Sequence, residues 1–307
     1  MENKIILPKK VKEKSILTQR VSIPEKIFFI FMAIFCAVYA FSLVFPVFWL
    51  LVKSLELSAM YDTNKIFEGW LYIPPITDLH PEQYIQAFTG LTYRGVNFLG
   101  MLTNSAWYVG VGTFQTIFWH ATTAYIISKY RFRGRNFLYN LVIINSIIPV
   151  YGTGGSTYAL ICNLGLYDQG IIYLIFTSFG GLGGQFLTMV GLFKGISWEY
   201  AEAVYIDGGG DTTVYFRIML PQAMPMLSAL AVAEGVALWN AYEGPLMYLP
   251  STPTVASGLY QIQTEVFHVG LPVYFCGLVI TLIPIMILYG FIAEKMMTNL
   301  SIGGLKG

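Results

Sequence analysis

Charged side chains are scarce in this sequence. Asp, Glu, Lys and Arg make up only 11% of its 307 residues, whereas soluble proteins carry about 25%. Hydrophobic residues account for 55%, so the chain has too few polar groups to cover a soluble globule. The net charge of +1, with no basic cluster among stacking aromatic residues, gives no indication of nucleic-acid binding. The composition therefore predicts an integral membrane protein in a lipid bilayer.

Cysteine and histidine are few and far apart. Cys36, Cys162 and Cys276 lie in apolar segments without a CxxC pair, which favours packing roles over a disulfide framework or a metal site. The sequence contains no GxxxxGK[ST] loop to cradle nucleotide phosphates, and no Ser, His and Asp set has supporting context. We therefore expect no catalytic residue, no metal site and no cofactor bound by this chain, and predict that it is not an enzyme.

The sequence instead contains long apolar runs. A bilayer-spanning helix needs about 20 mainly apolar residues, and residues 27–52 contain no charge. This first run lacks the features of a cleaved signal peptide and is expected to be a retained anchor. Five further spans are predicted at about 104–128, 137–161, 170–193, 226–249 and 272–293. The predicted fold is all-α, a polytopic membrane protein with six transmembrane helices.

The placement of Lys and Arg predicts the orientation. Of the 18 such residues, all but Lys53, Lys65 and Arg94 lie in the first 26 residues, in the KYRFRGR loop (129–135), near residues 194–217 or in the tail. Because positive residues concentrate on the cytoplasmic side, both termini and the KYRFRGR loop are expected there. Segment 53–103 is expected outside, partly as short surface helices. The chain is divided into a basic cytoplasmic tail, 1–26, and a transmembrane domain, 27–307.

A polar insert, EYAEAVYIDGGGDTTVYFRIMLP (199–221), separates two apolar regions. Ser197 can cap a helix that has Glu199 in its first turn, and the glycines 208–210 can end that helix. Asp211 can cap a second helix. Four residues fall on one face at helical spacing, where they would let another protein approach closely: Ala201, Val204, Tyr205 and Gly208. A solvated loop with frayed turns is the alternative.

Several motifs resemble those of one family. Glu202-Ala203-Val204, Ile206-Asp207-Gly208 and Leu220-Pro221 are similar to the EAA loop of the membrane subunits of binding-protein-dependent ABC importers. Val204 stands where that family usually has alanine, and Gly209 stands where alanine is common. NSAWYVGVGTFQTIFWHATTAYIISKYRFRGR, NLGLYDQG, LWNAY and SIGGLKG also resemble segments of the carbohydrate-uptake branch. Together the similar segments cover about two-thirds of the chain.

This resemblance implies a type I ABC importer permease that moves a sugar or an oligosaccharide across the bacterial cytoplasmic membrane. The EAA loop, about 195–224, is expected to form a coupling helix that docks on a cytoplasmic ATPase. The implied partners are a second permease subunit in a heterodimer, two ATPase subunits that use ATP and Mg, and an extracytoplasmic solute-binding protein. The expected docking residues are Glu202, Ala203, Val204, Asp207, Gly208, Leu220 and Pro221.

Three other functions remain open. A secondary transporter would need no ATPase, but such proteins typically show internal repeats and intramembrane ion-site charges. A membrane-embedded enzyme lacks a supporting motif, and an ABC permease for a non-sugar solute would share the EAA loop. The segment GGLGGQF (180–186) is similar to the signature sequence of ABC ATPases, but it lies in an apolar run. Its glycines, like those of YGTGGS (151–156), predict close helix packing or local unwinding.

The predicted fifth span contains two carboxyl groups, those of Glu234 and Glu243. A charge in hydrocarbon is costly, so such groups usually face a cavity or a partner. Glu234, with Asn240 nearby, is expected to line the translocation path and to accept hydrogen bonds from sugar hydroxyls. Trp239, Tyr242 and Glu243 are further candidates. A structural hydrogen bond from Glu234 to a neighbouring span or to the partner permease is the alternative.

Overall fold

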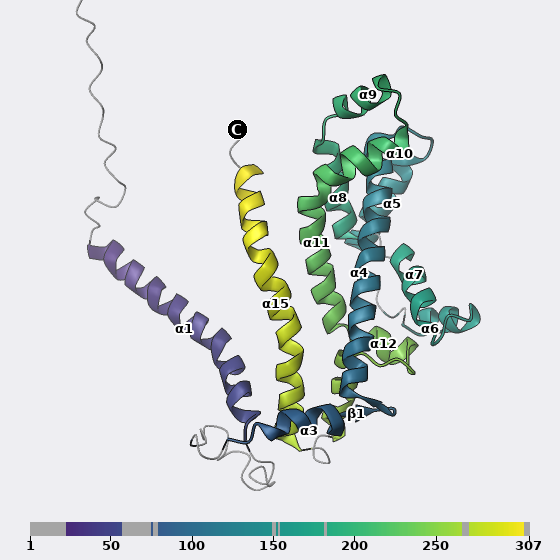
Figure 1. Ribbon diagram of the computed structural model, residues 1–307. Helices are drawn as coiled ribbons and strands as arrows, with labels where there is room; N and C mark the ends of the chain where they lie inside the picture. Colours follow the sequence, from purple (N-terminus) through teal and green to yellow (C-terminus); the bar gives the residue numbers. More distant parts are fainter. Residues whose placement is uncertain are drawn as a thin grey trace, which may run out of the picture. The chain divides into compact units, whose positions relative to one another are not determined.

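The computed structural model describes residues 23–56, 75, 79–148, 152, 154–180, 183–265 and 270–303. Nearly all of the basic tail, and residues 57–74 of the predicted external segment, lie outside this description. The chain separates into two units, residues 1–50 and 51–307. The described chain is helical apart from its connections and one pair of two-residue strands, so the all-α prediction is confirmed (Figure 1).

The first unit contains most of α1 (Ile23–Lys53), a helix of 31 residues. Apolar side chains are exposed along its length, among them Phe28, Phe35 and Val44. At a rise of about 1.5 Å per residue the helix is longer than the hydrocarbon core of a bilayer, which is about 30 Å thick. An all-round apolar surface of this length suits lipid rather than water.

The second unit is built around α4 (Phe98–Lys129), a helix of 32 residues. The Asn97 side chain caps its first turn by accepting a hydrogen bond from Gly100 N at 2.8 Å. Three helices pack along α4: α7 (Gly170–Gly180), α8 (Gly184–Gly195) and α11 (Leu220–Asn240). Residues of α4 take part in all three clusters of buried side chains, so this helix joins the two ends of the unit.

One end of this unit is formed around the start of α4. It contains α3 (Glu82–Gly90), α13 (Val255–Ile262) and the start of α15 (Leu271–Gly303). Strands β1 (Thr92–Tyr93) and β2 (Val96–Asn97) form a hairpin here. A buried ion pair joins Lys53 Nζ to Glu56 Oε1 at 2.7 Å, and the Gln83 side chain donates to Glu56 O. This end corresponds to the predicted external segment, and α3 is one of its expected short helices.

The opposite end carries the polar insert (Figure 1). It contains α5 (Arg135–Ile147), α9 (Glu199–Ile206), α10 (Asp211–Thr213) and a π-helix, η4 (Val214–Met219). Side chains of α4, α5, α8, α9, η4 and α11 share one buried cluster there. The polar insert is therefore a packed element rather than a solvated loop.

Several predicted spans are not single continuous helices in the structure. Span 137–161 corresponds to α5 and α6 (Gly154–Asn163), and span 170–193 is divided between α7 and α8. Span 226–249 is wrong in both bounds, since α11 begins earlier and is followed by α12 (Glu243–Tyr248). Among the described residues, two helices are long and apolar enough to cross a membrane, Ile23–Lys53 and Asp211–Asn240. The expected unwinding within GGLGGQF is confirmed, because α7 ends at Gly180 and Gly183 is extended.

Candidate functional site

Local signals set the limits of α9. Ser197 does not occupy the cap position as predicted, because the N-cap of α9 is Trp198, whose side chain makes no capping bond, although Ser197 Oγ accepts a hydrogen bond from Glu199 N at 3.3 Å. The helix ends at Ile206, and Gly208 follows with φ +79°, a conformation that glycine adopts without steric cost. Asp211 does not cap α10 as predicted. The cap position is Gly210, and the Asp211 side chain makes other hydrogen bonds.

The exposed face of α9 is not the face predicted from spacing. Ala201 is buried, and Val204 packs against the same cluster. The exposed face carries Glu202, Ala203 and Ile206, of which Ile206 is 86% exposed. Tyr200 and Tyr205 are exposed as well, by 52% and 39%, so three large apolar side chains lie beside the acidic groups of α9. An exposed group of this kind, unlike a single apolar residue, is suited to a protein partner.

Some of the other predicted docking residues are exposed, and one packs against the buried cluster. Asp207 and Gly208 are exposed beyond the end of α9, and Pro221 is exposed in the first turn of α11. Leu220 instead packs against the buried cluster. Val204 and Leu220 therefore support the loop from inside.

Val204 and Gly209 are in direct contact. A Cβ placed on Gly209 would lie 2.5 Å from Val204 Cγ1 and 3.1 Å from Val204 O. Atoms cannot approach to 2.5 Å without a shift, so Gly209 has no room for a methyl group while Val204 is present. The two departures from the alanine pattern are thus linked by one packing contact.

Asp211 ties α9 and α10 to the end of α4. Its Oδ1 accepts hydrogen bonds from Tyr205 at 2.5 Å and from Tyr130 at 3.0 Å. These bonds lower the pKa of Asp211, and the bond to Asp211 is the main reason that the pKa of Tyr205 is raised. The Tyr130 ring also packs edge-on against Trp198, with centroids 6.0 Å apart. Displacement of α9 therefore acts directly on the segment that follows α4.

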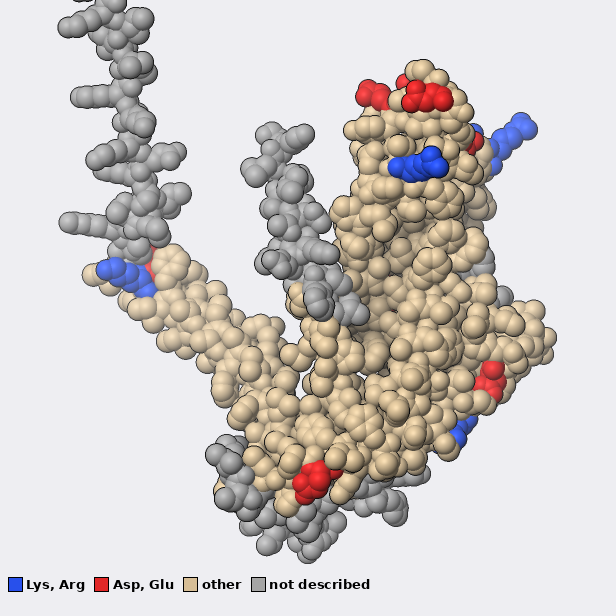
Figure 2. Space-filling model, viewed as in Figure 1, with Lys and Arg blue, Asp and Glu red and all other residues tan. Residues whose placement is uncertain are grey.

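Charges lie at the two ends of the second unit. Figure 2 shows acidic groups gathered at the end that bears α9, and a mainly uncharged surface between the ends. Glu199, Glu202 and Asp207 are the exposed acids of this end, and Arg217 of η4 lies close to them in the chain. The face of α9 is consequently acidic.

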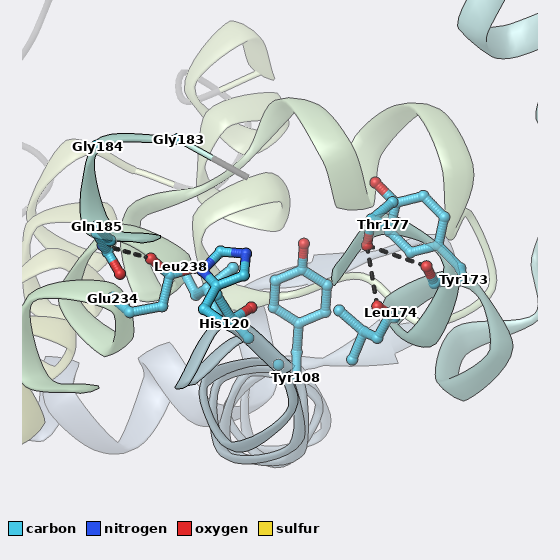
Figure 3. A pocket seen from close by; sticks show the side chains of 12 residues that line it. Tyr108, His120, Tyr173, Leu174, Thr177, Gly183, Gly184, Gln185, Glu234 and Leu238 are labelled. Atoms are coloured by element: carbon cyan, nitrogen blue, oxygen red, sulfur yellow. Dashed lines mark hydrogen bonds between the residues drawn. The ribbon is translucent and has the colours of Figure 1, made fainter. Parts of the chain in front are cut away.

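A second feature is a cavity of about 350 Å³ beside the middle of α4. Figure 3 shows the side chains that line it. Lining residues come from α4, α7, the glycine break before α8, and α11: Tyr108, Gly112, Thr116, His120, Tyr173, Leu174, Thr177, Gly183, Gly184, Gln185, Glu234 and Leu238. The break between α7 and α8 brings Gln185 to the wall, where its Nε2 donates to Glu234 Oε2 at 2.9 Å.

Of the predicted path residues, only Glu234 lines this cavity. Asn240 is exposed and donates to Val236 O of its own helix at 2.8 Å. Tyr242 stacks on Tyr260, with ring centroids 4.3 Å apart, and Glu243 is exposed at the start of α12. Trp239 is also absent from the lining.

Sequence reasoning missed the α4 wall of the cavity. Tyr108, Gly112, Thr116 and His120 are spaced four residues apart, and this spacing places them along one side of a helix. Their regular spacing within an apolar span was the available signal. The isolation of His120 in the sequence argues only against a metal site and does not bear on its place in a cavity wall.

Comparison with known proteins gives the class. Residues 120–300 match the family described as binding-protein-dependent transport system inner membrane component. The chain is 29% identical over 270 residues to the arabinooligosaccharides transport system permease protein AraQ of Halalkalibacterium halodurans, covering 87% of this chain and 93% of that protein. It is 24% identical over 264 residues to the diacetylchitobiose uptake system permease protein NgcG of Streptomyces coelicolor, covering 84% and 82%.

A solved structure agrees in fold. A chain of a bacterial ABC transporter involved in the import of the acidic polysaccharide alginate superposes with a TM-score of 0.71 at 19% identity, covering 90% of this chain and 99% of that chain. The chain belongs to the family of binding-protein-dependent transport system inner membrane components. It is a multi-pass permease subunit of an ABC importer and not an enzyme, because ATP hydrolysis resides in a separate subunit.

Proposed function

We propose that this permease imports an oligosaccharide, which an extracytoplasmic binding protein delivers, across the bacterial cytoplasmic membrane. Permeases named for arabinooligosaccharides, diacetylchitobiose and galactooligosaccharides are among its relatives. The observation that carries the coupling part of the proposal is the exposed acidic face of α9, whose other side packs against η4. ATP and Mg are used by the partner ATPase, and this chain binds no cofactor.

Placement of the basic residues supports an orientation with both termini and the EAA loop in the cytoplasm. Lys129 Nζ donates to Ile196 O just before α9, so the KYRFRGR loop and the EAA loop lie at one end. Lys53 and Arg94 belong to the opposite end, with α3 and the hairpin. Among the described residues of the second unit, the basic residues of the KYRFRGR loop thus lie at the end opposite to Lys53 and Arg94, which supports the proposed orientation.

The proposed assembly is a heterodimer with a second permease subunit and two ATPase subunits. In it, Glu202, Ala203, Ile206 and Asp207 contact the ATPase, and Gly208 sets the turn beyond them. An acidic face with an apolar centre fits a groove that has apolar walls and a basic rim. Val204 and Leu220 hold this face from within. Glu234 marks the translocation path.

The test is coupling between ATP hydrolysis and uptake. Glu202→Lys reverses the charge of the exposed face, and Gly208→Leu places a branched side chain at φ +79°. Each variant is expected to reduce co-purification of the ATPase, or sugar moved per ATP, by about tenfold, the equivalent of 1.4 kcal/mol. Abundance in the membrane should stay unchanged.

Glu82→Lys is the matched control, because Glu82 is an exposed acid at the opposite end. It should leave ATPase association unchanged. If both Glu202→Lys and Gly208→Leu kept normal ATPase association and normal coupling of ATP hydrolysis to uptake, α9 would not be part of the ATPase interface. Uptake that continues without any ATPase would instead favour a secondary transporter.

A further inference from the structure

The cavity beside α4 contains buried polar atoms that the described chain leaves without partners. His120 is only 4% exposed, and neither of its ring nitrogens makes a hydrogen bond. Gln185 Oε1, which belongs to another residue of the lining, is also buried without a partner. Unsatisfied buried polar groups are rare in folded proteins because each is costly. The cavity is therefore suited to an occupant that supplies hydrogen bonds.

Polar side chains from three helices line the cavity: His120 of α4, Gln185 of α8 and Glu234 of α11. In Figure 3 the His120 ring lies between the Glu234–Gln185 pair and the Tyr108 ring. A neutral imidazole presents one donor and one acceptor, whereas the Gln185 carbonyl oxygen only accepts. A hydroxyl group both donates and accepts, so several hydroxyls on one ligand can satisfy all of these atoms together.

Volume limits the occupant. The cavity holds about 350 Å³, near the lower end of the range of about 300–1,000 Å³ for small-molecule pockets. That space is equivalent to about a dozen waters at about 30 Å³ each. Tyr108, Tyr173 and Leu174 supply the apolar part of the wall. The space suits one ring of a longer substrate.

Charge limits the occupant further. The lining contains one carboxyl group, that of Glu234, and none of its 12 residues is Lys or Arg. An anionic ring would lose its hydration without gaining a cationic partner, and such desolvation is unfavourable. The cavity therefore selects against a uronic acid.

We propose that this cavity is a subsite for one neutral sugar ring, held by His120, Gln185 and Glu234. The proposal rests on the proposed oligosaccharide import and adds which residues of this subunit touch the cargo. It also separates this chain from importers of acidic polysaccharides, such as the alginate transporter that shares its fold.

The test uses the complete transporter with its own partner subunits and binding protein in proteoliposomes. The probes are labelled arabinotriose, galactotriose and trigalacturonate. The wild type should accumulate a neutral trisaccharide with ATP and exclude trigalacturonate. If the wild type accumulated none of the three trisaccharides, the result would count against the proposed function. If it preferred trigalacturonate, the result would count against the neutral-sugar subsite alone.

Variants then test the residues. His120→Leu, Gln185→Leu and Glu234→Leu should each lower the sugar moved per ATP by about tenfold while binding-protein-stimulated ATP hydrolysis persists. His120→Gln and Glu234→Gln keep a polar group and should retain most transport. Gln115→Leu is the control, since Gln115 Oε1 is also buried without a partner on α4 but lies outside the cavity lining.

Unchanged transport in the three leucine variants would overturn the subsite. Loss of assembly in both His120→Leu and His120→Gln would assign His120 to packing and would also overturn it. Equal losses in Gln115→Leu would show a general effect of polar groups in α4 rather than contact with sugar.

Discussion

At the scale of single residues, the contact between Val204 and Gly209 explains two unusual choices at once. The larger side chain at 204 occupies the space that a Cβ at 209 would need, since the two atoms would lie 2.5 Å apart. Gly209 is also followed by the start of α10, so a shift there would move Asp211 as well. The pair is therefore a single packing unit behind the exposed face of α9.

Gly209→Ala is expected to destabilise the loop by about 1–3 kcal/mol, because it overpacks this contact. Val204→Ala in the same chain should restore most of that loss. A double-mutant cycle on the thermal stability of the purified subunit measures the coupling, which should be about 0.5–3 kcal/mol. Additive effects would show that Val204 is not the obstacle.

Asp211 makes the stability of this loop depend on pH in the acid range. Its folded pKa lies below its ordinary value of 3.8 because Tyr205 and Tyr130 donate to it. Its contribution to stability is therefore present above about pH 3.8 and is lost as pH falls through the folded pKa. Limited pepsin digestion between pH 2.5 and 5 should show loop cleavage rising at the acid end, relative to other sites. Asp211→Asn should abolish this step, and an unaltered step would assign it to another group.

At the scale of elements, a local signal predicts where α9 ends, because Gly208 acts on the backbone next to it. The helix begins one residue later than the predicted cap implies, since Trp198 and not Ser197 is the N-cap. Which face of α9 is buried depends on α4, α8 and η4, and the sequence of the helix alone does not contain that information. The small residues of the helix predict an external partner, but Ala201 instead allows close packing within the chain.

The same reasoning applies to the cavity. Glu234 is predictable because a carboxyl group in an apolar span is costly. The same argument also points to Glu243, which is exposed at the start of α12 and lies outside the cavity lining. Gln185 could not be placed beside Glu234, because the break before α8 determines its position and the two residues lie 49 positions apart. The place of His120 in the cavity wall depends on which side of α4 faces α7 and α11, and the sequence of α4 alone does not determine this.

A buried ion pair between Lys53 and Glu56 lies against α3, where the Gln83 side chain donates to Glu56 O. The side chains of Lys53 and Glu56 are only 1% and 4% exposed. Glu56→Gln would leave a buried ammonium without this carboxylate and should destabilise the second unit by about 3–5 kcal/mol. Thermal unfolding of the purified subunit measures the effect. The double variant Lys53→Met/Glu56→Met should regain much of the loss, whereas Glu82→Gln in the exposed His80–Glu82 pair should change little.

At the scale of the whole molecule, the orientation can be tested by labelling. Single cysteines at Lys65 and Arg133 should react from opposite sides of the membrane, Lys65 from outside and Arg133 from the cytoplasm. Cys36, Cys162 and Cys276 are first replaced, with Cys276→Ser because the Cys276 side chain donates to Ser54 O at 3.1 Å. Labelling of both positions from outside intact cells would contradict the orientation and the proposed ATPase contact.

The polar wall of α4 has a consequence for how such proteins are recognised. This helix has 32 residues and only one charged residue, Lys129, yet among the described helices it does not meet the hydropathy criterion for a span. Tyr108, Thr116 and His120, which face the cavity, lower its average hydropathy. A span that serves a hydrophilic cargo thus loses the signal by which spans are counted. Hydropathy is expected to undercount spans most where a transporter surrounds its cargo.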